Sequence, residues 1–153
     1  MYTIEEFDFQ KTKVFKYLMF KKRAEAEIRS KFRGQIEENM LEDIIEYLKE
    51  AGYINDYNYI QKQVNEYINL KNMSIQEIKY KLMAKGIDKR LIEKYIEENR
   101  EELEEYEEKS AENIKNKKAN QMDEQEIKQY LYKKGYSCEL IWITKGTKQC
   151  KTY

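Results

Sequence analysis

The chain has 153 residues, of which 41% are hydrophobic and 38% charged, and its 29 basic and 29 acidic side chains give a formal net charge of zero. This balance excludes a uniformly basic coat for nucleic acid. The sequence contains no histidine, no proline and only five scattered glycines, so it lacks the commonest general base and metal ligand, the strongest helix breaker and a phosphate-binding loop. We therefore expect an all-α protein that is not an enzyme, with no catalytic residues, metal or cofactor.

The two cysteines, Cys138 and Cys150, are too few to close a zinc site of four nitrogen or sulfur ligands. No apolar run approaches the roughly 20 residues of a membrane span. The N-terminal residues MYTIEEFDF carry acids where a secretory signal would be basic. We expect reduced thiols and a cytoplasmic protein without a membrane partner.

The first predicted helices span residues 9–22, 25–33 and 40–51. Their apolar positions Ile28, Phe32 and Leu41 recur 50 residues later and again after a further 49, with spacings of four and nine each time. The recurring residues are Ile78, Leu82 and Leu91, followed by Ile127, Leu131 and Leu140. Self-similarity at a period of 20–50 residues indicates a repeat architecture.

The repeat predicts further helices at 57–71, 75–85 and 89–101, then at 103–119, 124–134 and 138–145. We therefore expect tandem three-helix repeats that form an elongated, curved array. The predicted boundaries are 9–56, 57–102 and, for a more degenerate third repeat, 103–146, followed by a tail at 147–153.

Helix caps agree with this division. Ser74 with Glu77 and Asp123 with Glu126 have the spacing of capping boxes. Ala24 occupies the corresponding place in the first repeat, so we expect the helix after it to lose its cap and fray. We also expect Asp56 and Asp88 to cap the helices that follow them.

Three groups of segments carry a more specific pattern: Gly52-Tyr53-Ile54-Asn55-Asp56 with Tyr59, Ile78 and Leu82 with Lys85-Gly86-Ile87, and Arg23-Ala24-Glu25-Ala26-Glu27-Ile28. In order and spacing these segments resemble the RecX family of recombination regulators, with Ala24 in place of the family's usual serine. The resemblance extends over about residues 14–145. It implies a protein that binds the RecA recombinase filament and reaches single-stranded DNA mainly through it. It also implies inhibition of filament extension, ATP hydrolysis, strand exchange and coprotease activity. We expect the protein to be a monomer.

Basic residues that recur at equivalent repeat positions are the candidate contacts to a filament or to DNA. They are Arg29, Lys79 and Lys128, then Lys31 and Lys81, with Arg23, Arg33, Lys85, Lys89 and Arg90 beside them. Regular spacing of like charges suits a polymer with repeated acidic groups or phosphates. The alternative is that these side chains keep the helices solvated and pair with Glu27 and Glu77.

The run from Glu97 to Glu108 is strongly acidic, since residues 93–112 carry ten acidic and three basic groups. We interpret it as a solvated helix or linker, with contact to a basic patch or repulsion of DNA as the alternatives. Two other functions also remain open. The helices around Gly86 have helix-turn-helix proportions, which would suit a DNA-binding module, and a helical array can also serve as an interaction scaffold.

Overall fold

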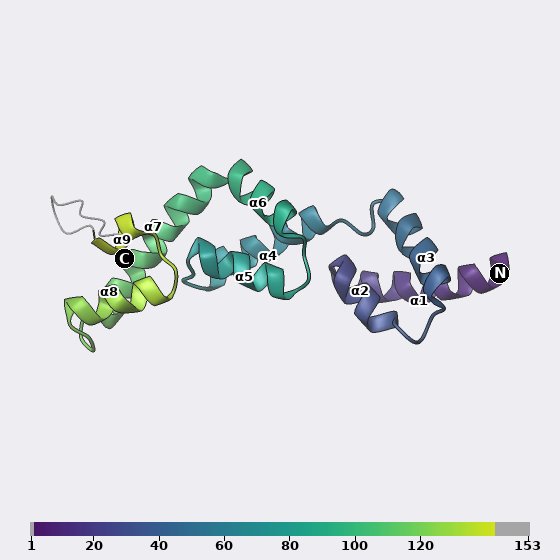
Figure 1. Ribbon diagram of the computed structural model, residues 1–153, viewed down its shortest axis with the longest axis horizontal. Coiled ribbons are helices and arrows are strands. Elements are labelled where there is room, and N and C mark those ends of the chain that lie inside the picture. The colour runs from purple at the N-terminus through teal and green to yellow at the C-terminus, as the bar shows by residue number, and fades with distance from the viewer. Residues whose placement is uncertain (1, 143–153) are drawn as a thin grey trace. The chain divides into compact units, whose positions relative to one another are not determined.

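A computed structural model describes residues 2–142, and this part of the chain is helical, with one isolated bridge between Arg33 and Ile36 and no strand. The helices in it, shown in chain order in Figure 1, are α1 (Ile4–Phe20), α2 (Glu25–Phe32), α3 (Glu38–Glu50), α4 (Asp56–Leu70), α5 (Ile75–Ala84), α6 (Lys89–Glu98), α7 (Arg100–Lys118), α8 (Glu124–Lys133) and α9 (Cys138–Trp142). The all-α prediction is confirmed. The predicted tail at 147–153 and Cys150 lie outside the described residues.

The predicted helices agree with the structure except at a few ends. The predicted start of the first helix at residue 9 is wrong, because α1 begins at Ile4. Thr3 accepts a hydrogen bond from the backbone of Glu6, and the Glu6 side chain accepts one from the backbone of Thr3. This capping box satisfies two N–H groups of the first turn, and its spacing is visible in the sequence. The end predicted at residue 101 lies inside α7, since α6 ends at Glu98.

The described chain divides into two compact units, each of which is considered by itself. Residues up to Gln61 together with Leu82–Ile92 form unit 1, and Lys62–Lys81 together with the chain from Glu93 onward form unit 2. The division therefore crosses α4, α5 and α6.

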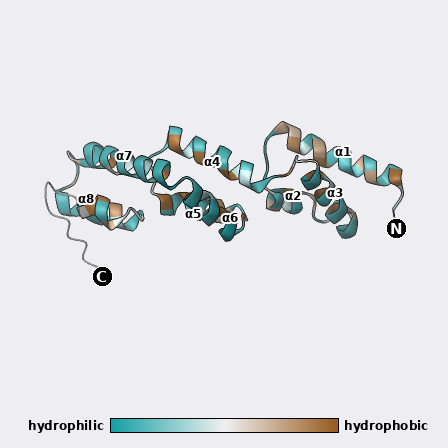
Figure 2. Cartoon of the chain, turned by 90° about the horizontal axis from the view of Figure 1, so that it is seen from above, coloured by the Kyte–Doolittle hydropathy of each residue, from teal (hydrophilic) through white to brown (hydrophobic). Residues whose placement is uncertain are grey.

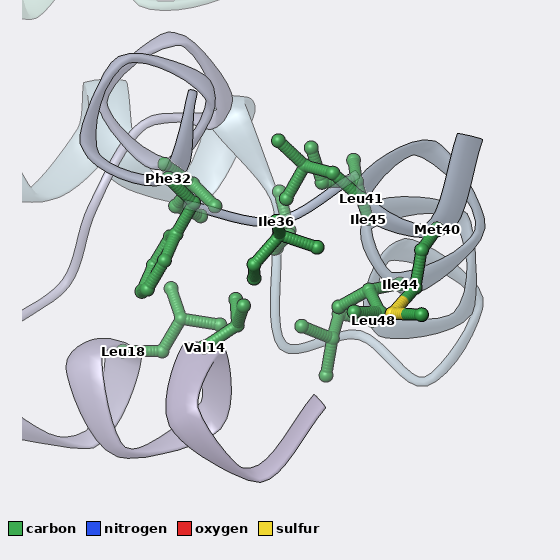
Figure 3. Packing of buried hydrophobic residues seen from close by; sticks show 11 residues of the cluster. Val14, Leu18, Phe32, Ile36, Met40, Leu41, Ile44, Ile45 and Leu48 are labelled. Atoms are coloured by element: carbon green, nitrogen blue, oxygen red, sulfur yellow. The ribbon is translucent and has the colours of Figure 1, made fainter. Parts of the chain in front are cut away.

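The core of unit 1 lies between α1, α2 and α3. In Figure 3, Val14 and Leu18 of α1 point toward Phe32 of α2 and toward the aliphatic side chains of α3, with Ile36 between them. Burial of a side chain of this size contributes about 1.5–3 kcal/mol. Ile28, Phe32 and Leu41, three of the positions that define the repeat, belong to this core.

The core of unit 2 includes a cluster formed by α7, α8 and α9. It contains Ala111 and Ile114 of α7, Ile127 and Leu131 of α8, and Ile141 of α9. Ile127 and Leu131 are the third copies of the repeat positions that Ile28 and Phe32 occupy in unit 1. The same sequence pattern therefore builds both cores.

A carboxylate on another helix caps the second helix of a triplet in both units. The backbone N–H of Glu25, the first residue of α2, donates to Oδ1 of Asp56 in α4 at 2.9 Å. The backbone N–H of Ile75, the first residue of α5, donates to Oε2 of Glu107 in α7 at 2.8 Å. Burial raises the pKa of Asp56, an effect that the Glu25 N–H partly offsets.

The prediction that Asp56 caps its own helix is wrong. Oδ1 of Asn55 accepts the hydrogen bond from the backbone of Asn58 at 3.1 Å, which leaves Asp56 to cap α2. Ala24 provides no side-chain cap, as predicted. Asp56 instead accepts a hydrogen bond from the backbone of Glu25, which removes part of the reason to expect fraying of α2. The caps by Asp88, Ser74 and Asp123 are confirmed, with backbone groups of Arg90, Glu77 and Glu126 donating at 2.8, 3.0 and 2.8 Å.

Two glycines bring helices into close contact. Gly86 has φ of +82°, and a Cβ built on it would lie 2.6 Å from Cβ of Ala26 in α2. Gly135 has φ of +87°, and its Cβ would lie 2.8 Å from Cβ of Gln76 in α5. Both positions require glycine for the left-handed backbone and for the missing side chain.

None of the helices among the described residues is long and apolar enough to cross a membrane. Figure 2 shows hydrophilic and hydrophobic residues interspersed along the helices, with α7 almost entirely hydrophilic.

Candidate partner-binding surface

The structure separates the predicted basic residues into two groups by what they contact. Arg29 of α2 forms two hydrogen bonds to the Glu42 carboxylate of α3, at 2.6 and 2.8 Å. Lys79 of α5 pairs with Glu93 of α6 at 3.2 Å. Lys128 pairs with Glu124 one turn earlier in α8, at 3.3 Å.

These three pairings favour a structural role for the residues that follow the shared isoleucine. The hydrogen bonds that Arg29 donates to the Glu42 carboxylate raise the pKa of Arg29 and lower the pKa of Glu42. In two of the three triplets the pair joins the second helix to the third, so its charge is largely neutralised within the fold.

Lys31 and Lys81 belong to the second group. Lys31 Nζ lies 5.9 Å from the ring centroid of Tyr17, and Lys81 Nζ lies 5.6 Å from that of Tyr67. Lys31 and Lys81 are 50 residues apart, as are Tyr17 and Tyr67, so the two contacts occupy equivalent positions of the repeat. Both lysines are exposed, and no carboxylate in residues 2–142 is recorded within 4.0 Å of either.

Further cations gather around each of these lysines. In unit 1, Arg23 lies 4.1 Å from the Tyr17 ring, and Lys85 Nζ lies 6.0 Å from the ring of Tyr59. Tyr59 donates its hydroxyl to Glu27 at 2.9 Å, and Glu27 lies 3.9 Å from Arg23. These contacts connect Lys31, Arg23 and Lys85, which we call junction 1.

In unit 2 the equivalent surface, which we call junction 2, consists of Lys71, Lys81 and Lys134. The neighbouring Lys71 lowers the pKa of Lys81, with smaller lowering from partial burial and from Lys134. Glu77 lies 4.0 Å from Lys134 and also caps α5 through the backbone of Ser74. Crowded like charges cost stability unless an anion offsets them, so junction 2 is suited to an anionic partner.

Sequence reasoning overlooked Lys71 and Lys134. Lys134 lies 49 residues after Lys85 and Lys71 lies 50 residues after Lys21, so the repeat itself contained the signal. Among the other predicted residues, Arg33 lies with Arg29 around a hollow of about 480 Å³ that Glu38 and Glu42 also line. Lys89 and Arg90 begin α6.

The acidic run forms the end of α6 and the first half of α7, and much of it is internally paired. Arg100 pairs with Glu97 and with Glu104, the latter at 3.4 Å. The solvated-helix interpretation overlooked Glu107, which is only 4% exposed. Its two oxygens accept from the backbones of Ile75 and Ser137, at 2.8 and 3.0 Å.

Within residues 2–142, no group of three or more acidic or cysteine side chains is arranged to hold a metal ion. Helix triplets with recurring cores, recurring caps and cationic surfaces define this chain as a helical-repeat protein whose chemistry suits binding.

Comparison with known proteins places the chain more narrowly. No family model matches it. It is 32% identical to the regulatory protein RecX of Staphylococcus carnosus over 143 residues, which are 90% of this chain and 53% of that protein. It is 39% identical to the regulatory protein RecX of Finegoldia magna over 83 residues, 54% of this chain and 40% of that protein. The chain thus spans about half the length of the curated relatives it matches.

Solved structures agree with this comparison. The crystal structure of RecX from Lactobacillus salivarius matches with a TM-score of 0.77 and 25% identity, over 91% of this chain and 94% of that one. A second RecX crystal structure matches with a TM-score of 0.78 at 23% identity and supports the fold alone. The chain belongs to the RecX family of regulatory proteins.

Proposed function

We propose that this protein binds the RecA recombinase filament on single-stranded DNA and inhibits its extension, ATP hydrolysis, strand exchange and coprotease activity. The observation that carries the proposal is the similarity to regulatory protein RecX across 90% of the chain, together with the matching fold. We further propose that it acts in the cytoplasm as a monomer of three helical repeats, and that it reaches DNA mainly through the filament.

Junctions 1 and 2 are the proposed contact surfaces. Among the described residues, Lys31, Lys71, Lys81 and Lys85 have no carboxylate within 4.0 Å, whereas Lys134 lies 4.0 Å from Glu77. Exposed cations raise the association rate with an oppositely charged surface and favour it over neutral ones. The row formed by Arg29, Lys79 and Lys128 is assigned a structural role, because an internal carboxylate already pairs with each of its members.

The test measures ATP hydrolysis by RecA filaments preassembled on single-stranded DNA. Substoichiometric protein should slow hydrolysis, since one inhibitor would act on several protomers. A hydrolysis rate unchanged at equimolar protein, with the protein shown to be folded by circular dichroism, would contradict the proposal.

The DNA-binding alternative has less support from the structure. Gly86 does make a tight turn between α5 and α6. However, Glu93 of α6 pairs with Lys79, and Glu97 and Glu98 follow on the same helix. Carboxylates there would oppose phosphate binding. Tight, steeply salt-dependent binding of duplex DNA by the protein alone would favour this alternative.

A further inference from the structure

Two large apolar side chains are strongly exposed at equivalent positions of the repeat. Phe20, the last residue of α1, is 86% exposed, and Leu70, the last residue of α4, is 78% exposed. They are 50 residues apart, the period that relates the first two triplets. A single exposed apolar residue is ordinary, but the repetition of one at the same place is informative.

Each of these side chains lies beside a cationic junction. Phe20 follows Tyr17 by three residues and Leu70 follows Tyr67 by three, a spacing that places both members of a pair on one side of a helix. Tyr17 and Tyr67 are the rings beside Lys31 and Lys81. A further lysine follows each apolar residue directly, Lys21 in one copy and Lys71 in the other.

The third triplet lacks this combination. The residues 49 positions after Leu70, Lys71 and Lys81 are Ala119, Asn120 and Tyr130. The apolar side chain and both lysines are lost together, while the core positions Ile127 and Leu131 are retained. The large exposed apolar side chain and the two lysines are therefore replaced together in the third triplet.

The identity of the two exposed apolar side chains, Phe20 and Leu70, which we call the anchors, distinguishes between two kinds of anionic partner. Single-stranded nucleic acid is bound by cations together with aromatic rings, on which its bases stack. Phe20 could serve as such a platform, but Leu70 has no π-face. What the two copies share is an aliphatic or aromatic apolar surface beside lysines, which is complementary to a protein segment that carries both acidic and apolar side chains.

We infer that the exposed anchors Phe20 and Leu70, together with Lys31 and Lys81, dock an acidic protein segment that carries an apolar side chain. The inference rests on the proposed function, in which that segment belongs to the protein part of the RecA filament rather than to its DNA. Two copies of the surface allow two such segments to be bound, so modest affinities multiply.

The experiment compares two double variants with wild type. Phe20→Ser with Leu70→Ser removes the anchors, and Ile4→Ser with Tyr132→Ser changes two other exposed side chains (78% and 61% exposed) as a matched control. Fluorescently labelled protein is titrated with RecA filaments on single-stranded DNA and, separately, with the bare single strand. Circular dichroism verifies the helical content of each variant.

The anchor variant should bind filaments about tenfold more weakly or worse, with the control close to wild type and weak binding of the bare strand unchanged in all three. Wild-type affinity of the anchor variant for filaments would overturn the inference and leave the proposed function intact. An equal loss on filament and bare strand would also overturn it, in favour of nucleic-acid recognition. Failure of wild type to bind filaments would instead refute the proposed function.

A second variant, Lys31→Gln with Lys81→Gln, keeps the anchors and provides an independent test should removal of the anchors lower the helical content. It should also weaken filament binding, because the carboxylates of the segment lose their partners. Filament affinity equal to that of wild type would contradict the inference by itself.

Discussion

At the scale of single residues, Glu107 combines features that rarely occur together. It lies in the most acidic part of the chain, yet its carboxylate is buried and accepts backbone hydrogen bonds from Ile75 and Ser137. Ile75 is the first residue of α5 and Ser137 precedes α9. One side chain of α7 therefore holds the starts of two other helices in unit 2, and a buried anion is tolerated because both oxygens are satisfied.

Glu107→Ala should lower the free energy of unfolding by about 2–4 kcal/mol, because two partly buried N–H groups at helix starts lose a charged acceptor. Urea denaturation followed by far-UV circular dichroism measures this. Glu108→Ala, at the exposed neighbouring position, is the matched control and should change stability by less than about 0.5 kcal/mol. Equal effects of the two changes would show that the buried bridge contributes nothing specific.

Ser74 and Ala24 occupy the same position of two triplets. Ser74 accepts from the backbone of Glu77 at 3.0 Å and donates its hydroxyl to the carbonyl of Lys134 at 2.5 Å. Ala24, which is fully buried, can do neither. The first triplet therefore retains only the carboxylate cap from Asp56.

Ala24→Ser should raise the free energy of unfolding by about 1 kcal/mol, because a serine there could cap α2 and reach the carbonyl of Lys85, the counterpart of Lys134. Ser74→Ala should lower it by about 1–2 kcal/mol. Thermal denaturation of both variants checks the pair. A destabilised Ala24→Ser protein would mean that the buried site has no room for the hydroxyl.

At the scale of elements, close contacts between helices depend on glycine. The turn between α5 and α6 lies against α2 through Gly86, and the turn between α8 and α9 lies against α5 through Gly135. Two kinds of contact between triplets therefore recur. In one, a glycine in a turn packs against a helix, and in the other a carboxylate caps the start of a helix.

Gly86→Ala should be more destabilising than Gly34→Ala, although the two glycines have nearly the same φ, +82° and +81°. Alanine at 34 meets nothing within 4 Å and bears only the backbone cost of about 1–2 kcal/mol, whereas alanine at 86 would also overlap Ala26. The overlap should add about 1–3 kcal/mol. Chemical denaturation measures both, and similar losses would show that the close contact relaxes without cost.

At the scale of the whole molecule, the net charge of zero conceals an uneven distribution. Residues 1–36 carry nine basic and five acidic groups, and residues 113–153 carry nine and four. Internal ion pairs neutralise the row of Arg29, Lys79 and Lys128. Lys31 and Lys81 have no such carboxylate partner among the described residues, which is why junctions 1 and 2 are the contact surfaces that we propose.

Filament association should therefore depend on salt through the junctions. At low salt, Lys31→Gln with Lys81→Gln should bind more weakly than wild type by about 0.4–2 kcal/mol, and at about 1 M salt, where the Debye length is about 3 Å, the two proteins should converge. Arg29→Gln with Lys79→Gln should lower the Tm and leave the salt dependence of binding unchanged. If Arg29→Gln with Lys79→Gln changed the salt dependence of binding and Lys31→Gln with Lys81→Gln did not, the row of Arg29, Lys79 and Lys128 would be the contact surface instead.

The sequence by itself determined the helices, the repeat and the family resemblance. Helix ends follow from local signals such as Ser74 with Glu77, and the core positions follow from a recurring spacing of apolar residues. The first helix was predicted to start too late because the capping box of Thr3 and Glu6 was overlooked, not because its signal was absent.

Only the tertiary structure decided which charged side chains are paired within the fold and which face solvent. Arg29 and Lys31 are two residues apart on one helix and look alike in sequence, yet one meets Glu42 of α3 and the other does not. Asp56 and Glu107 likewise cap helices 31 and 32 residues away in the chain. The physical reason is that capping, ion pairing and burial of a charge depend on partners brought near by folding, whereas helix formation depends on neighbours within one or two turns.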